Sequence, residues 1–188
     1  MVGDNADSNG DLEIKRTFIS LAVPSTAAYT YTESPPLEQI ATSVTLTEVN
    51  AFTLIRASVT ITGGTFPGDG DVISANTTGV AITAIYHSAN EQLLLTGTDT
   101  LADYRAVLQS VAFATTSPNP TDSGAHPTRT VTWVAYDGLN SSTPATTSVN
   151  IIALVRALSG GSSPLGTSTT LVVRCRGRVC LTMNQRPP

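Results

Sequence analysis

Residues 128–138 read T-R-T-V-T-W-V-A-Y-D-G, a run in which two sets of side chains alternate before an Asp-Gly turn. Val131, Trp133 and Ala135 share one face of this run, and the residues between them share the other. Such a run is typical of an antiparallel strand that turns one face toward a core. The stretch therefore predicts a sheet packed against a second layer, with Trp133 buried between the two.

Short runs of the same kind recur throughout residues 27–154, and turns rich in Gly, Pro, Asn and Asp separate them. Many short strands at this spacing predict an all-β fold, a sandwich of two sheets. The turn at residues 68–71, G-D-G-D, is expected to be a hairpin turn rather than a metal site. The predicted strands are 28–32, 43–47, 54–62, 72–75, 80–86, 92–96, 111–115, 128–136 and 146–154.

One segment departs from the two-residue period. Apolar residues between Leu101 and Leu108 recur at helical spacing. Thr100 stands before them as an N-cap, and Asp103 follows three residues later in the capping-box position. We therefore expect a short helix over 101–109, packed across one end of the sandwich.

The composition fits an extracellular β-rich module rather than a helical enzyme. Only 13% of the 188 residues are charged and 40% are hydrophobic. The part before residue 155 has 5 basic and 14 acidic residues, a net charge of −9, while residues 155–188 carry +5. An acidic body argues against nucleic-acid binding and leaves carboxylates available for cations. No stretch approaches the roughly 20 apolar residues of a membrane-spanning helix, so membrane insertion is not expected.

Three segments follow from these patterns. Residues 1–26 form a polar N-terminal segment that includes one short apolar run, and residues 27–154 hold the predicted sandwich. Residues 155–188 are rich in Gly, Ser and Pro and then basic, without a sustained period, so we expect a disordered tail. Both cysteines, Cys175 and Cys180, lie in that tail, so the sandwich has to be stabilised by its core rather than by disulfides.

Several pieces of the chain resemble, in order and spacing, a cadherin-like repeat of very large bacterial surface proteins and adhesins. The resemblance covers about residues 28–154. It implies an Ig-like or cadherin-like Greek-key β-sandwich that is stabilised by calcium, repeats in tandem and serves as a spacer or adhesive stalk. The matching pieces are Y-T-E-S-P-P-L (31–37), V-T-L-T-E-V-N (44–50), A-S-V-T-I-T-G-G (57–64), G-D-V-I-S (70–74), L-L-L-T-G-T-D-T-L-A-D-Y-R-A-V-L-Q-S-V (93–111) and the stretch at 128–138.

The resemblance also implies a calcium site at the ends of strands. Its ligands here would be Glu33, Glu48, Asn50 and Asp137. The acidic D-x-D pair of the family is E-V-N in this chain, so Asn50 offers a neutral carbonyl where a carboxylate is expected, and calcium should bind weakly. The plain alternative is that Asp137 only shapes its Asp-Gly turn and that the other residues lie in solvated loops.

The expected function is that of a noncatalytic extracellular or cell-surface module, one repeat of a larger surface or secreted protein. Its expected partners are neighbouring repeats or a surface ligand, either protein or glycan. Catalysis is not expected, because His87 and His126 belong to no recognisable motif. The alternative is a carbohydrate-binding β-sandwich module, for which Tyr86 and Tyr136 are the chief candidates as sugar-stacking aromatics.

Overall fold

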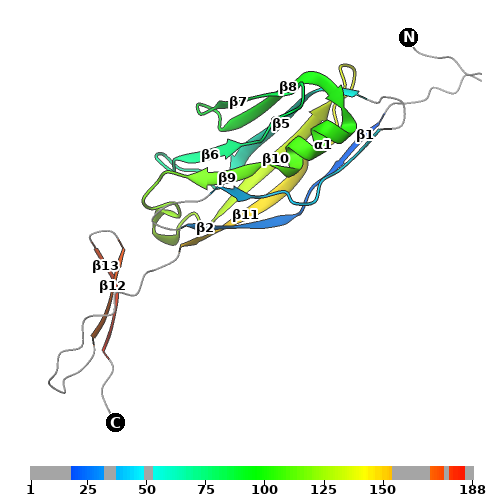
Figure 1. The fold of residues 1–188 in the computed structure, drawn as a ribbon. Helices are drawn as coiled ribbons and strands as arrows, with labels where there is room; N and C mark the ends of the chain where they lie inside the picture. The colour runs from blue at the N-terminus through cyan, green and yellow to red at the C-terminus, as the bar shows by residue number, and fades with distance from the viewer. Residues whose placement is uncertain (1–17, 32–36, 49–52, 154–169, 176–177, 185–188) are drawn as a thin grey trace, which may run out of the picture.

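The computed structural model describes residues 18–31, 37–48, 53–153, 170–175 and 178–184. Most of these form a β-sandwich with one short helix, which confirms the predicted fold class (Figure 1). Each of the nine predicted strands is present; the strand at 128–136 has the predicted bounds, and the others have ends that differ by a few residues. No helix in the described part of the chain is long and apolar enough to cross a membrane.

The first layer is a six-stranded sheet that includes β10 (Thr128–Tyr136), the strand formed by the T-R-T-V-T-W-V-A-Y run. All neighbouring strands run antiparallel except β2 (Thr26–Tyr31) and β11 (Ala145–Ala153), which are parallel. In spatial order the strands are β2 (Thr26–Tyr31), β11 (Ala145–Ala153), β10 (Thr128–Tyr136), β5 (Thr53–Gly63), β8 (Gln92–Thr100) and β7 (Thr83–His87).

The second layer is made of two smaller sheets that lie over the first (Figure 1). One is the pair β1 (Ile19–Ala22) and β4 (Thr45–Glu48), and the other has the order β3 (Glu38–Gln39), β9 (Ala112–Thr115) and β6 (Asp71–Ser74). The helix α1 (Leu101–Gln109) joins β8 to β9, and a single 3₁₀ turn spans Asp122–Gly124.

The core between the layers is built by the inward faces of the strands and by one face of α1. Trp133 is fully buried there, as predicted, in one cluster with Phe113, Tyr104 and Leu108. Its indole Nε1 donates a hydrogen bond to the Thr147 hydroxyl at 3.1 Å. The alternating pattern of β10 thus buries its apolar face, and the one polar atom of Trp133 has a hydrogen-bond partner in the core.

The helix α1 has the predicted bounds and the predicted N-cap. The Thr100 hydroxyl accepts a hydrogen bond from the Asp103 backbone N–H at 3.1 Å, and it also contacts the Asp103 carboxylate. The cap satisfies a backbone donor that the first turn of a helix leaves free. The apolar face of α1 then enters the core through Tyr104, Val107 and Leu108.

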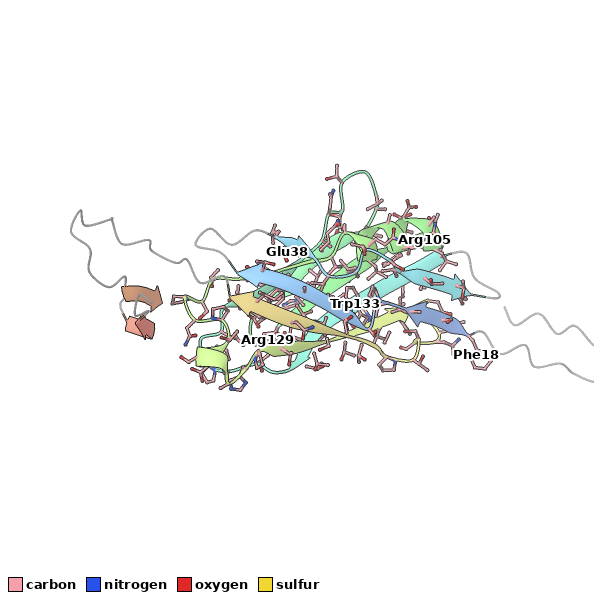
Figure 2. The ribbon with its side chains drawn as sticks, turned by 90° about the horizontal axis from the view of Figure 1, so that it is seen from below. Phe18, Glu38, Arg105, Arg129 and Trp133 are labelled. Carbon is pink, nitrogen blue, oxygen red and sulfur yellow. The ribbon has the colours of Figure 1, made fainter. Side chains whose placement is uncertain are left out.

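The chain enters and leaves the sandwich at opposite ends. Ile19, the first residue of β1, pairs with Glu48, and this end also holds Asp137; it is called the Asp137 end below. The strand β11 runs the other way and finishes beyond Thr128, at what is called the Arg129 end. Figure 2 shows Phe18 at one end, Arg129 toward the other and Trp133 between them.

Two predicted boundaries need correction. The sandwich begins before residue 27, because β1 pairs with β4 and buries Ile19 and Leu21. In the tail, Thr170–Cys175 (β12) and Arg178–Asn184 (β13) form an antiparallel hairpin that shares no sheet with the other described strands. The expectation of a tail without regular structure therefore does not hold for these two segments, while residues 154–169 lie outside the described part.

Candidate functional site

The structure brings together two of the four predicted calcium ligands, Glu48 and Asp137. Glu48 is the last residue of β4, and Asp137 directly follows β10. Their carboxyl groups are close enough at the Asp137 end for each to shift the pKa of the other. Two strands from different layers therefore end in one carboxyl pair, beside the point where the chain enters the sandwich.

Asp137 also has the plain structural role that its Asp-Gly sequence indicates. Its Oδ1 accepts hydrogen bonds from the backbone N–H groups of Leu139 at 2.7 Å and Asn140 at 2.6 Å. These bonds close the turn between β10 and β11, and they help to lower the pKa of the Asp137 carboxyl. Asp137 is thus held as a carboxylate in a fixed orientation.

Glu48 is in the opposite electrostatic situation. Neither of its two buried carboxylate oxygens accepts a hydrogen bond from any donor in the described residues. Loss of hydration is the main reason that the pKa of Glu48 rises to about 7, and the neighbouring Asp137 carboxyl raises it further. Near pH 7 the Glu48 carboxyl therefore gains and loses its proton readily, and a cation bound beside Asp137 would favour the ionised form.

The other two predicted ligands, Glu33 and Asn50, lie outside the described residues. The strand β2, which precedes Glu33 along the chain, ends at Tyr31 opposite Ala153, at the Arg129 end of the sheet. The strand β4, which precedes Asn50, ends at Glu48 itself. In the described part of the chain, no three Asp, Glu, His or Cys side chains are grouped so that they could hold a metal ion.

The pair fits a calcium ion in part. Calcium takes six to eight oxygen ligands, several of them from carboxylates. Glu48 and Asp137 supply two carboxyl groups, and the two unpaired oxygens of Glu48 are the kind of buried acceptor that a cation would satisfy. The remaining oxygens would have to come from water, from residues outside the described part or from a neighbouring domain.

The pH dependence of stability gives a direct test of this pair without metal. Because folding raises the pKa of Glu48 from 4.5 to about 7, its contribution to stability is present below pH 4.5 and is lost as the pH rises through 7. Glu48→Gln should therefore match the parent protein at pH 4.5. At pH 8 the variant should be more stable by about 1–2 kcal/mol, less than the full pKa shift implies because the side chain is only partly buried.

The measurement is the free energy of unfolding in urea, with a chelator present, at both pH values. Asp137→Asn serves as the second variant, since it keeps the acceptor of the turn and removes the neighbouring charge. It should lower the pKa of Glu48 and reduce the pH dependence. If Glu48→Gln changed the free energy of unfolding equally at pH 4.5 and pH 8, the pKa of Glu48 would not be raised in the folded protein.

A second group of charges, which the sequence argument did not single out, lies at the Arg129 end. The Arg129 guanidinium is fully buried and forms an ion pair with the buried Asp71. It also donates hydrogen bonds to the carbonyl oxygens of His126 at 2.9 Å and Pro120 at 2.7 Å. Burial raises the pKa of Asp71 to about 7, against the opposing effect of Arg129. The carboxyl groups of Asp69 and Glu91 add to the local negative charge.

The turn at residues 68–71 leads from β5 into β6 of the other layer rather than closing a hairpin, and the Asp69 side chain holds it. The Asp69 carboxylate accepts hydrogen bonds from the backbone N–H groups of Phe66 at 3.1 Å and Asp71 at 3.4 Å. Arg129 supplies a positive charge beside Asp71, so one acid of this group is paired with a cation from within the fold. The Arg129 end therefore differs in kind from the Asp137 end, where no cation faces the carboxyl pair among the described residues.

The two aromatics of the alternative hypothesis occupy different environments. Tyr86 donates a hydrogen bond from its hydroxyl to the Asp71 carbonyl at 2.7 Å and packs against the core. Tyr136 lies on the outer face of the six-stranded sheet, where it lines a shallow hollow. The Arg56 guanidinium lies over its ring, 4.8 Å from the ring centroid.

Comparison with known proteins adds no relative from which a function could be taken: neither a protein-family model nor a curated protein sequence matches the chain.

Proposed function

We propose that this chain is a noncatalytic structural and adhesive module of the extracellular space or cell surface, one cadherin-like repeat of a larger protein, stabilised by weakly bound calcium. The observation that carries the proposal is the pairing of Glu48 with Asp137. A partly buried carboxyl whose oxygens have no donor among the described residues, beside a second carboxyl, destabilises a fold unless a proton or a cation is bound. A calcium ion would remove that penalty and contribute positive charge where the described part of the site has none.

The path of the chain supports a mechanical role. The described sandwich starts at Phe18 at the Asp137 end and finishes with β11 at the Arg129 end. Modules with this path can follow one another end to end, as in a stalk. Calcium held by Glu48 and Asp137 would join the end of β4 to the turn after β10, beside the strand through which a preceding module would connect.

The test is the effect of calcium on the thermal unfolding of the full chain. With a Kd of about 10⁻⁴–10⁻³ M, as in extracellular modules, 10 mM calcium (at least about tenfold above Kd) should stabilise the fold by about 1.4–2.7 kcal/mol. The melting temperature should therefore rise by several degrees. Magnesium should do less, because it gives up its water reluctantly and requires a tighter octahedron.

Variants locate the site. Asp137→Asn keeps the turn and removes one carboxylate, and Glu48→Gln removes the other, so each should abolish most of the calcium-dependent rise. Glu91→Gln is the matched control, because it removes a carboxylate at the Arg129 end. A rise that survives the first two substitutions, or that disappears with Glu91→Gln, would assign calcium to another site. A melting temperature indifferent to calcium would leave a sandwich held by its core alone.

The alternative, a carbohydrate-binding module, keeps one supporting observation. Tyr136 lines a hollow on the outer sheet face, as a sugar-contacting aromatic would. Tyr86 does not add to it, because its hydroxyl is bonded to the Asp71 carbonyl. The two functions are compatible, since the hollow and the carboxyl pair use different residues.

A further inference from the structure

The outer face of the six-stranded sheet carries a hollow that neither the core nor the carboxyl pair explains. It has a volume of about 230 Å³ and opens to solvent. That volume is below the roughly 300–1,000 Å³ of pockets for drug-sized ligands, so it suits a single small group. Its lining includes Arg56, Ser58, Gln92, Leu94, Tyr136 and Ser141.

The hollow arises from side-chain size across three neighbouring strands. Ser58 on β5 stands directly between Leu94 on β8 and Val134 on β10, and it is the smallest side chain of that row. The next pair along the strands, Arg56 and Tyr136, forms one wall. Cross-strand neighbours stand close enough for a small residue between larger ones to leave a depression.

Arg56 is the distinctive group of this hollow. It is exposed, and the Arg129–Asp71 contact is the one ion pair among the described residues, so no described carboxylate neutralises Arg56. Stacking on Tyr136 orients the guanidinium, because a cation is attracted to the face of an aromatic ring. The ring is itself fixed by a hydrogen bond from its hydroxyl to the Gly138 carbonyl at 2.7 Å.

Uncharged polar groups surround this cation. The Gln92 amide Nε2 donates to the Thr60 hydroxyl at 3.1 Å, a bond that orients the amide and leaves its oxygen as an acceptor. The hydroxyls of Ser58 and Ser141 line the same hollow. The site thus offers one fixed positive charge, several neutral donors and acceptors, and an apolar strip from Leu94 and Val134.

We propose that this hollow binds one carboxylated sugar residue, such as a uronic or sialic acid at a glycan terminus. A guanidinium pairs with a carboxylate through two parallel hydrogen bonds, and its outer edge remains available while its face rests on Tyr136. The serine hydroxyls and the Gln92 amide match the hydroxyls of a sugar ring, whose C–H groups pack on Leu94. An acidic peptide fits less well, because its several charges would meet one arginine on a body of net charge −9 before residue 155.

The inference goes beyond the calcium-stabilised module, since it assigns a ligand class to a different surface. The experiment titrates the isotope-labelled full chain by NMR with methyl β-D-glucuronide and with the methyl glycoside of N-acetylneuraminic acid. At least one of them should bind saturably with a Kd of about 1 mM, typical for a ligand of this size. Methyl β-D-glucoside, the neutral counterpart of the first, should bind at least about tenfold more weakly.

The variants separate this site from general charge effects. Arg56→Gln should weaken binding of the acidic sugar at least about tenfold, and Ser58→Leu should abolish binding by filling the hollow from an outward-facing position. Arg105→Gln is the matched control, because it removes an exposed arginine from α1 and should leave binding unchanged. Each titration is run once with calcium and once with a chelator. Sugar binding that is equal in both would show that this site does not depend on the proposed calcium site.

Three results would overturn it. One is the absence of saturable binding of either acidic sugar at concentrations about tenfold above the expected Kd. Another is equal binding of an aspartate-rich peptide, which would indicate a protein ligand. The third is an equal effect of Arg56→Gln and Arg105→Gln, which would reduce the binding to net charge.

Discussion

Replacing Arg129 with methionine is expected to lower the free energy of unfolding by about 3–5 kcal/mol. The guanidinium is fully buried and satisfies Asp71 together with two backbone carbonyls. It also lies over the Phe66 ring, 5.3 Å from its centroid. Methionine restores the apolar volume but leaves these acceptors without a donor, which is the condition under which buried polar groups destabilise a protein most.

The pH dependence of this loss distinguishes an ion pair from simple packing. Burial already raises the pKa of Asp71, and the removal of Arg129 takes away the effect that opposes the rise. A carboxyl with a raised folded pKa loses stability as the pH increases, so Arg129→Met should be more destabilising at pH 8 than at pH 5.5. Asp71→Asn should instead remove this pH dependence, because it removes the carboxyl that titrates and leaves an arginine that cannot release its proton.

Urea unfolding of both single variants and of the double variant would measure these effects. The double variant should be more stable than the sum of the single losses predicts, by about 1–3 kcal/mol for groups in direct contact. Additive losses, or a loss below about 1 kcal/mol for Arg129→Met, would show that the pair contributes little. Since small domains are stable by only about 5–15 kcal/mol, the expected loss is within reach of the measurement.

The burial of Arg129 could have been predicted from the alternating pattern of β10, although an arginine is usually exposed. It occupies the same alternating face as Val131, Trp133 and Ala135, so the period that predicts a buried tryptophan also places an arginine in the core. An arginine at such a position requires a buried acceptor. The sequence leaves that partner open, because Asp71 lies far along the chain and meets Arg129 only when the two layers close.

The alternating pattern also predicts the inward direction of Glu48, at the Asp137 end. This residue is in step with Val44 and Leu46, which are both buried, so its side chain is directed toward the interior rather than into a solvated loop. This alternation explains why loss of hydration is the main cause of its raised pKa. What could not be read from the sequence is the meeting with Asp137, which depends on how β4 lies against the end of β10.

The hollow beside Arg56 lay beyond sequence reasoning for a different reason. Strict alternation would put Arg56 on the same face as the buried Leu54. The pairing of β5 with β8 shifts register between these two residues, so Arg56 faces outward while Ala57 and Val59 face the core. An irregularity of this kind arises from the pairing of two strands and has no local signature in the sequence.

Two strands of the sandwich, β1 and β3, were not predicted because their sequences carry little pattern. The strand β3 has two residues, and β1 has four, of which only Ile19 and Leu21 face inward. Two apolar residues in a polar segment carry little signal. The nine predicted strands and α1 were recovered because each repeats its pattern or carries a cap, and because the core selects the same faces that the pattern predicts.

Trp133→Ala is expected to destabilise the sandwich by about 3–5 kcal/mol, enough to unfold a marginal domain. The side chain is fully buried at the centre of β10 and packs in the cluster that joins both layers with α1. It is the single tryptophan of the chain, so the fluorescence of the parent protein reports this position alone. Emission should be blue-shifted and poorly quenched in the folded state.

A matched pair of variants separates the volume of the ring from its hydrogen bond. Trp133→Phe keeps most of the apolar contact and loses the Nε1 bond to Thr147, whose hydroxyl still donates to the Pro24 carbonyl at 2.7 Å. Its loss should therefore be smaller than that of Trp133→Ala. Thr147→Val should cost about 1–3 kcal/mol, because the indole N–H is then buried without an acceptor.

Circular dichroism in urea gives the free energies of all three variants, since two of them lack tryptophan. A red-shifted, freely quenched emission from the parent protein would contradict the burial of Trp133. So would equal losses for the alanine and phenylalanine variants, which would mean that the volume of the ring contributes nothing to stability. If the alanine variant unfolds while the phenylalanine variant remains folded, the stretch at 128–138 holds the two layers together through the aromatic side chain at its centre.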